Sequence, residues 1–161
     1  MIIRSIKQSD WSEVSRIYKA GIETGMATFE TTVPTWETWN QKYHPFCRLL
    51  LVENSKIAGW AALAPVSKRK VYQGVAEVSI YMDTLFRAKG LGKLIFEELI
   101  TESEKQGIWT LQSGIFPENM ASIHLHQKMG FRMIGYREKI AQLKGVWKDN
   151  VLLERRSTKN F

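Results

Sequence analysis

The chain has 161 residues, of which 44% are hydrophobic and 24% are charged, a balance that indicates one soluble globular domain over residues 1–161. No apolar run is long enough to cross a membrane, and the N-terminus lacks the apolar centre of a signal peptide, so we expect a cytoplasmic protein with no membrane partner. The net charge of +7 is dispersed, which argues against a nucleic-acid partner. The single cysteine, Cys47, excludes an intrachain disulfide and a multi-cysteine zinc site; we expect a small core residue there, and no bound metal.

The hydrophobic pattern predicts strands and helices in an irregular order. For the first half it predicts a strand at 2–6, a helix from Trp11 behind the capping signal Ser9-Asp10, an ordered loop at 25–34, a short helix at 35–43, a hairpin of strands at 48–53 and 57–64, and a strand at 74–82. For the second half it predicts a helix over about 90–106 that ends at Gly107, a strand at 108–116, a helix at 121–129 that ends at Gly130, and strands at 131–140 and 146–154. This order indicates the α+β class, a mixed sheet with helices packed on it, rather than a doubly wound fold.

The stretch RAKGLGK at 87–93 joins a predicted strand to a predicted helix and carries two glycines, Gly90 and Gly92. The free N–H groups of a first helical turn and the helix dipole favour an anion there, and a glycine lets a phosphate approach the backbone closely. The arginine and lysines of the stretch can add charge-assisted contacts. The spacing fits neither a nucleotide-triphosphate loop nor a dinucleotide fingerprint. On these residues alone, a turn with a convenient helix start stays open as the alternative.

Two motifs resemble the signatures of the GNAT superfamily of acetyl-CoA-dependent N-acyltransferases. RAKGLG at 87–92 is similar to the Arg/Gln-x-x-Gly-x-Gly/Ala signature, and it likewise follows a strand and opens a long helix. NMASIHLHQKMGF at 119–131 is similar to the Asn-x-x-Ala/Ser-x-x-Leu-(Tyr)-x-x-x-Gly-Phe block. Over nearly the whole chain the resemblance is closer to the phosphinothricin acetyltransferase-like branch, through ATFET at 27–31, GWA at 59–61, AEVSIY at 76–81 and GVWKD at 145–149.

This resemblance implies a GNAT-like fold in which two splayed central strands hold the pantetheine arm of acetyl-CoA, and it implies a homodimer. The residues that it implies for binding the cofactor are Ser79, Ile80, Tyr81 and Met82 on the strand, Arg87, Ala88, Lys89, Gly90, Leu91, Gly92 and Lys93 in the loop, and Asn119 and Ser122 at the second motif. For Asn119, a helix-capping role stays open beside a bond to the pantetheine.

A carboxylate stands in the middle of the strand predicted at 74–82. Alternation puts Glu77, Ser79 and Tyr81 on one face of that strand. Strands disfavour glutamate, and burial would raise its pKa, so its presence there is unusual. Amide formation needs a free amine, and a base must take a proton from the ammonium form. The resembling branch carries its catalytic glutamate at this position, so we expect Glu77 to be the base, with an edge-exposed glutamate as the alternative.

The second motif carries two histidines. The resembling branch places a histidine where His126 stands, which implies that His126 protonates the departing sulfur; a merely structural histidine is the alternative. Helical spacing puts His126 on the same face as Ser122, whereas His124 faces elsewhere and is expected at the surface. Backbone N–H groups near Ser79 and Ile80 are candidates for stabilising the oxygen of the tetrahedral intermediate.

The residues expected to bind the acceptor are Phe29, Glu30, Arg69, Tyr72 and Trp147. Arg69 can bind a carboxylate or phosphinate bidentately, or it is a solvated arginine in a basic loop. Trp147 either lines the pocket, from its own subunit or from across a dimer interface, or belongs to the core. The sequence therefore predicts an N-acetyltransferase for a small amino-acid-like amine of the phosphinothricin, methionine sulfoximine or methionine sulfone type. The alternatives are acetylation of a polyamine or a protein N-terminus, and a non-catalytic acyl-CoA-binding module.

Overall fold

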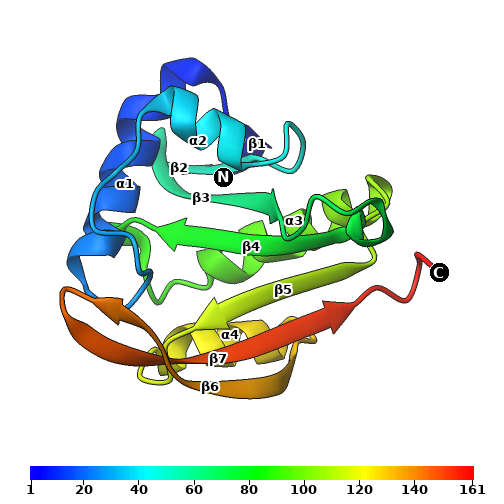
Figure 1. The fold of residues 1–161 in the computed structure, drawn as a ribbon. Coiled ribbons are helices and arrows are strands. Elements are labelled where there is room, and N and C mark those ends of the chain that lie inside the picture. Colours follow the sequence, from blue (N-terminus) through cyan, green and yellow to red (C-terminus); the bar gives the residue numbers. More distant parts are fainter.

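Seven strands form one mixed sheet, in the order β1-β2-β3-β4-β5-β7-β6, in the computed structural model, which describes all 161 residues (Figure 1). The strands are β1 (Ile2–Ser5), β2 (Leu49–Glu53), β3 (Lys56–Pro65), β4 (Val75–Met82), β5 (Thr110–Ile115), β6 (Arg132–Leu143) and β7 (Val146–Arg156). The helices are α1 (Trp11–Glu23), α2 (Trp36–Lys42), α3 (Leu91–Lys105) and α4 (Met120–Lys128), with short 3-10 turns η1 (Gln8–Asp10), η2 (Lys70–Tyr72) and η3 (Thr84–Phe86). Only β4 and β5 pair in parallel, so the predicted mixed sheet is confirmed.

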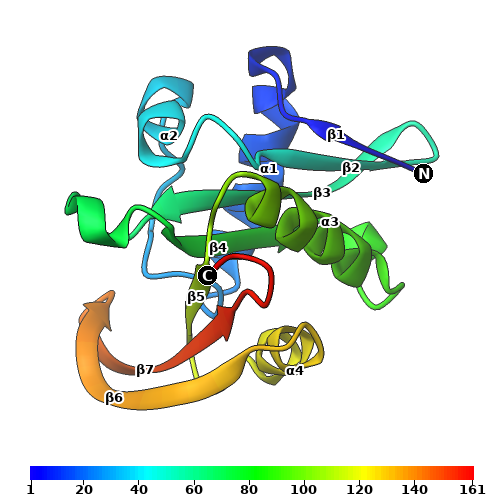
Figure 2. The same cartoon turned by 90° about the vertical axis from the view of Figure 1, so that its right-hand side faces the viewer.

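Two hydrophobic cores hold helices on opposite faces of the sheet, and Figure 2 shows α2 on one side with α3 and α4 on the other. In α1, the buried residues Val14, Ile17 and Tyr18 recur at helical spacing. They form the first core together with Trp39 of α2 and with the sheet. The strand β2 serves both cores, because Leu50 packs with α1 and α2 while Leu49 and Leu51 pack with α3 and α4. Cys47 lies in the second core, as expected, where burial raises the pKa of its thiol to about 12.

The capping signal predicted at the start of α1 acts one turn earlier, at η1, where the Asp10 carboxylate takes part in a capping box with Lys7. Asp10 precedes the helix, but its side chain makes no bond to the first helical turn. Its carboxylate instead accepts two hydrogen bonds of 2.8 Å from the Arg4 guanidinium and one of 2.8 Å from the N–H of Lys7. The bidentate pair with Arg4 is a charge-assisted contact, stronger than a cap on a neutral N–H, and it holds the pKa of Asp10 below its usual range.

The helix ends agree with the sequence, and the last hairpin is longer than predicted. Gly107 and Gly130 follow α3 and α4 with φ of +79° and +85°, the left-handed conformation that glycine adopts without strain. The strand β6 continues three residues past the predicted end at 140. A register shift between Arg137 and Ala141 interrupts its pairing with β7, and such bulges bend a strand.

The central strands separate where the resemblance implied a splayed pair. β4 pairs with β5 only through residues 75–77 and 110–112. Beyond Glu77 the two strands diverge toward their carboxyl ends (Figure 1), while β4 stays paired with β3 up to Met82. Every second backbone N–H and C=O of the carboxyl half of β4 therefore faces a gap in the sheet rather than another strand.

Candidate active site

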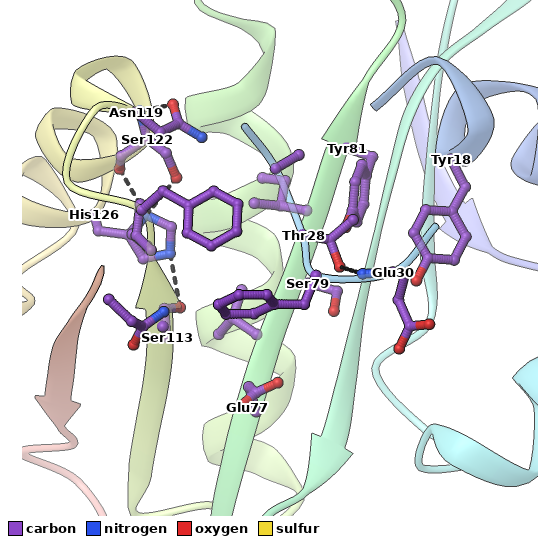
Figure 3. Close-up of a pocket in the computed structure, with 18 of the residues that line it drawn as sticks. Tyr18, Thr28, Glu30, Glu77, Ser79, Tyr81, Ser113, Asn119, Ser122 and His126 are labelled. Carbon is purple, nitrogen blue, oxygen red and sulfur yellow. Dashed lines mark hydrogen bonds between the residues drawn. The ribbon is translucent and has the colours of Figure 1, made fainter. Parts of the chain in front are cut away.

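A cavity of about 300 Å³ lies in the gap between β4 and β5 (Figure 3). Its lining comes from α1 and the loop after it, from the end of α2, from β4 and β5, from α4 and the residue before it, and from β6 and β7. The charged side chains among this lining are Glu30, Lys42, Glu77 and Arg137. Two carboxylates and two cations around one cavity suit a zwitterionic molecule that carries both an ammonium and an anionic group.

His126 forms one wall of the cavity and is almost fully buried, at 2% exposure. Its Nδ1 lies 2.7 Å from the carbonyl oxygen of Ser122, and its Nε2 lies 2.8 Å from Oγ of Ser113 (Figure 3). A carbonyl oxygen only accepts, so Nδ1 carries the hydrogen, and Nε2 of the neutral ring accepts from the Ser113 hydroxyl. The helical spacing correctly predicted the contact between His126 and Ser122, and the expected surface position of His124 is confirmed.

The surroundings of His126 favour its neutral form. The rings of Phe96 and Phe131 meet the imidazole edge to face, with centroids 4.9 and 5.0 Å away. Burial lowers the pKa of His126 below its usual range, and the hydrogen bond to the Ser122 carbonyl opposes only part of that effect. The imidazole is therefore uncharged at neutral pH, with the lone pair on Nε2.

Asn119 joins α4 to the loop after α1. Its side-chain oxygen accepts from the N–H of Ser122 at 3.3 Å, so the capping alternative is confirmed. Its Nδ2 donates to the carbonyl oxygen of Met26 at 3.2 Å, across 93 residues of sequence. One amide thus fixes the start of α4 and the loop that carries Phe29 and Glu30.

Glu77 lies on the cavity side of β4 and is exposed. β4 is a central strand, but β5 turns away directly after Glu77, so the carboxylate faces solvent in the gap rather than protein. Its neighbour two positions on, Ser79, accepts a hydrogen bond of 3.0 Å from the phenol of Tyr43. The strand thus offers an open carboxylate beside a fixed hydroxyl.

Aromatic side chains close the side of the cavity toward α1 and α2. The ring of Tyr81 stacks on Trp60 with centroids 4.9 Å apart, and Tyr18 lies 4.9 Å from Tyr81. A Cβ at Gly21 would come within 2.6 Å of the Tyr81 ring, so glycine lets α1 approach this wall. Burial raises the pKa of Tyr18 to about 12, so its phenol stays protonated at neutral pH and serves as wall or hydrogen-bond donor.

The glycine-rich loop begins just beyond the carboxyl end of β4. Gly90 precedes α3 with φ of +76°, which explains glycine there by conformation alone. Gly92 lies inside the first turn, where an added Cβ would meet only ordinary contacts, the nearest being Leu125 at 3.6 Å. The N–H groups of Leu91 and Gly92 have no acceptor within the helix. Three exposed basic residues surround this helix start: Arg87, Lys89 and Lys93.

A family comparison agrees with this geometry. The profile described as the acetyltransferase (GNAT) domain matches residues 3–152. The chain belongs to the GNAT acetyltransferase family. A Bacillus subtilis (strain 168) protein, YwnH, named provisionally as a phosphinothricin acetyltransferase, is 32% identical over 160 residues, which cover 96% of this chain and 98% of that protein.

Solved structures share the fold of this GNAT acetyltransferase. The ribosomal-protein-alanine N-acetyltransferase of Brucella melitensis has a TM-score of 0.89 at 25% identity, covering 98% of this chain and 100% of that one. A phosphinothricin acetyltransferase from Sinorhizobium meliloti, solved in complex with acetyl-CoA, has a TM-score of 0.87 at 24% identity and covers 99% and 89%. The α+β GNAT fold expected from the sequence is thereby confirmed.

The cavity of this acetyltransferase brings together many of the predicted site residues: Phe29, Glu30, Glu77, Ser79, Ile80, Tyr81, Asn119, Ser122 and His126. Met82 and the loop from Arg87 to Lys93 lie outside its lining. No group of three metal-binding side chains comes together, and no helix is long and apolar enough to cross a membrane.

Three residues predicted to bind the acceptor do not line this cavity. Arg69 and Tyr72 lie at the exposed turn η2, where the guanidinium sits 5.4 Å above the phenol ring. Trp147 is 55% exposed in the hairpin of β6 and β7, so the core alternative for it is wrong. Their roles in acceptor binding stay predictions.

Sequence reasoning missed several residues that line the cavity: Lys42, Tyr43, Ser113, Arg137 and Asn150. A signal existed for Ser113, because it alternates with Leu111 and Ile115 on the buried face of β5, where a polar residue is exceptional. No local signal existed for Arg137, because the bulge in β6 decides where it points.

Proposed function

We propose that this acetyltransferase transfers the acetyl group of acetyl-CoA directly to the free amino group of a small amino-acid-like acceptor, of the phosphinothricin, methionine sulfoximine or methionine sulfone type. The observation that carries the proposal is the cavity in the β4–β5 gap. It joins the buried histidine wall to a rim with both carboxylates and cations. Its lining from both sides of the gap suits a reaction in which thioester and amine meet without a covalent enzyme intermediate.

The residues around the start of α3 fit the pyrophosphate of coenzyme A. Free N–H groups at a helix N-terminus, a glycine inside the first turn and three exposed basic side chains are features that bind phosphate. The backbone of β4 from Ser79 to Met82, which β5 leaves unpaired, would hydrogen-bond the pantetheine arm. Acetyl-CoA as the co-substrate is supported by the Sinorhizobium meliloti relative, which was solved in complex with it.

In the proposed reaction, Glu77 takes a proton from the acceptor ammonium, because its carboxylate is open to the cavity and to solvent. The amine attacks the thioester carbonyl, and N–H groups of β4 near Ser79 and Ile80 stabilise the oxygen as it becomes negative. The C–N bond forms, the C–S bond breaks, and His126 assists the departing thiolate. The position of the acceptor in the cavity decides whether Glu77 takes this proton directly or through one water.

For the anionic end of the acceptor, the cavity offers Arg137 and Lys42. Arg137 donates to the side-chain oxygen of Asn150 at 2.9 Å, and Asn150 is 5% exposed. A Cβ at Gly114 would lie 3.0 Å from the Asn150 amide, so this amide is closely packed. A guanidinium held in this way is suited to binding a carboxylate or phosphinate. We therefore add Arg137 to Arg69 as a second candidate for binding the anionic group of the acceptor.

A second candidate acceptor is a protein N-terminus. The Brucella melitensis structure with a TM-score of 0.89 is named for acetylating the alanine of a ribosomal protein. A peptide would share the free α-amino group with the proposed acceptor, but it would need space beyond a cavity of about 300 Å³. A polyamine lacks the anionic group that Arg137 and Lys42 would bind.

The test is a panel of amines with purified protein, with free thiol release from acetyl-CoA as the readout. We expect phosphinothricin, methionine sulfoximine and methionine sulfone to react faster than spermidine or an alanine-initiated peptide. Faster reaction with the peptide would establish the second candidate. No thiol release with any amine, under conditions where coenzyme A binds, would establish a non-catalytic binding module.

We also propose a homodimer that uses the hairpin of β6 and β7. β6 is an edge strand, and the hairpin exposes large apolar side chains: Met133, Ile134, Tyr136, Ile140, Val146 and Trp147. An edge with such a patch suits association with a second copy. Light scattering at micromolar concentration checks this, and a mass near the 18.6 kDa of one chain would contradict it.

A further inference from the structure

The buried face of β5 carries one polar side chain that the proposed reaction has not used. Ser113 is 3% exposed and lies between Leu111 and Ile115, which belong to the hydrophobic core. Burial of an unbonded hydroxyl is costly, and here the partner is Nε2 of His126, 2.8 Å from Oγ. Both side chains line the cavity. Ser113 therefore stands at the one ring atom of His126 that is able to gain a proton.

The acceptor nitrogen loses two protons during the reaction, and the two sides of the cavity would take up one each. At neutral pH the acceptor is an ammonium, R–NH₃⁺, and the product amide keeps a single N–H. The nitrogen thus loses two protons, while the departing thiolate needs one to become a thiol. Glu77 is exposed, so a proton on its carboxylate is able to pass to solvent, whereas His126 is buried, so a proton on its ring stays within the cavity.

We propose that Ser113 holds His126 in the ring form whose Nε2 is an acceptor, and that its hydroxyl carries the proton between the cavity and that nitrogen. This rests on the proposed function. In the resting protein the hydroxyl donates to Nε2 and offers its lone pairs to the cavity, where the acceptor nitrogen donates to it. After Glu77 has taken the first proton and the amine has attacked, the second proton moves from the positively charged nitrogen of the tetrahedral intermediate to Oγ as the hydroxyl proton moves to Nε2, and the ring becomes imidazolium.

After the C–N bond forms and the C–S bond breaks, the proton moves back along the same hydrogen bonds. The imidazolium donates from Nε2 to Oγ, and the hydroxyl proton turns toward the thiolate, which becomes the thiol of coenzyme A. Nδ1 keeps its bond to the Ser122 carbonyl throughout, and that bond stabilises the charged ring. One proton returns to sulfur and the other leaves through Glu77, so the sum is R–NH₃⁺ plus acetyl-CoA giving amide, coenzyme A thiol and one H⁺.

No charged side chain replaces Ser113 at the ring. The ring's other close neighbours are Phe96 on α3, Phe131 after α4, and Ser122, whose carbonyl oxygen lies 2.7 Å and whose hydroxyl lies 3.5 Å from Nδ1. The charged groups of the cavity, Glu30, Lys42, Glu77 and Arg137, make no hydrogen bond to the imidazole. Removal of the Ser113 hydroxyl thus leaves Nε2 without a partner in the protein.

The activity test compares Ser113→Ala with Ser113→Thr, which keeps the hydroxyl. General acid–base groups contribute about 10²–10⁴-fold, so we expect Ser113→Ala to lower kcat by about tenfold or more, since water replaces the hydroxyl only in part. The KM for acetyl-CoA should stay within about twofold, and Ser113→Thr should recover most of the rate.

A double variant tests whether the two residues act as one unit. Ser113→Ala/His126→Asn should be no slower than His126→Asn alone. His124→Asn, on the same helix but exposed, serves as the control with unchanged kcat.

A second measurement does not depend on turnover. Two-bond ¹H–¹⁵N spectra of the histidine rings distinguish the Nδ1–H form, the Nε2–H form and imidazolium, and we expect the neutral Nδ1–H form for His126 at neutral pH. An Nε2–H or charged ring in the resting protein would overturn the proposal. So would wild-type kcat in Ser113→Ala, or additive losses in the double variant. Failure of the proposed function is a different result, namely no thiol release by the wild-type enzyme.

Discussion

The two sides of the cavity are built in opposite ways. On the side of β5 and α4, His126 and Ser113 are almost fully buried and bonded to each other, and Asn119 uses both ends of its amide. On the acceptor side, Glu30, Lys42, Glu77 and Arg137 are exposed, and among them only Arg137 has a side-chain hydrogen bond, to Asn150. Residues 113–131 supply the first side, whereas four distant segments supply the second.

This difference suits the two molecules that the enzyme would bind. A thioester of constant structure is best met by groups fixed in advance, because fixed dipoles need no rearrangement during the reaction. Exposed charges on loops and a bulged strand are free to differ without disturbing the core. We infer that the β5–α4 side sets the chemistry and that the exposed side sets the acceptor.

The strongest test of that division is Glu77, which lies on the exposed side but is assigned to the chemistry. Glu77→Gln should lower kcat by roughly 10²-fold or more, because a general base is lost, while coenzyme A affinity stays unchanged. The acidic limb of the rate–pH profile should disappear. Steady-state kinetics across pH and calorimetric titration with coenzyme A measure the two effects. A variant with wild-type rate and profile would show that water or another group takes the proton.

Two arginines compete for the anionic end of the acceptor. A hydrogen bond to a charged group is worth about 1.5–3 kcal/mol, so loss of the true anchor should reduce kcat/KM by about ten- to a hundredfold. We expect that loss for Arg137→Ala, because Arg137 lines the cavity and is held by Asn150. Arg69→Ala is the matched comparison at the exposed turn η2.

Kinetics with phosphinothricin or methionine sulfone at saturating acetyl-CoA decide between them. A large effect of Arg69→Ala alone would restore the prediction made from the sequence and would require η2 to move over the cavity. Indifference to both substitutions would favour an acceptor without an anionic group.

The glycine loop offers a test in which stability and binding change in opposite directions. Gly92 has a helical position with room for a Cβ, so Gly92→Ala should stabilise α3 by about 0.5–1 kcal/mol. The same Cβ would keep a phosphate from the backbone, so coenzyme A should bind about tenfold more weakly, as expected for a lost charge-assisted bond. Gly90→Ala is a poor test, since φ of +76° strains any side chain there. Unchanged affinity in the Gly92→Ala protein would contradict the proposal that the start of α3 binds the pyrophosphate of coenzyme A.

The sequence could predict the α4 part of the buried side because its contacts are local, although it missed Ser113 on β5. Helical spacing alone places Ser122 against His126, and Gly130 marks the end of α4. The acceptor side was predicted only where a motif covered it, at Phe29, Glu30 and Glu77. Arg137 depends on a bulge, which no local pattern marks. Asp10 shows a related limit, because its carboxylate caps η1 one turn before α1 and also binds Arg4, and only the fold brings Arg4 to it.

The smallest effect concerns Asn119, the residue that ties the two sides together. Asn119→Ala removes the cap of α4 and the bond to Met26, and the lost cap alone should cost about 0.5–2 kcal/mol of unfolding free energy. Asn119→Asp keeps a capping oxygen of equal quality, but it replaces the amide donor with a carboxylate that repels the Met26 carbonyl. It should therefore unfold near the wild-type temperature while freeing the loop that carries Phe29 and Glu30.

The freed loop should change the kinetics. Loss of one neutral hydrogen bond, worth about 0.5–1.5 kcal/mol, should raise the KM of the acceptor about two- to tenfold with the KM of acetyl-CoA unchanged. Calorimetry and kinetics on the two variants separate these effects. A raised KM for acetyl-CoA instead would mean that Asn119 contacts the pantetheine, and equal destabilisation of both variants would show that the Met26 bond, rather than the cap, holds α4 in place.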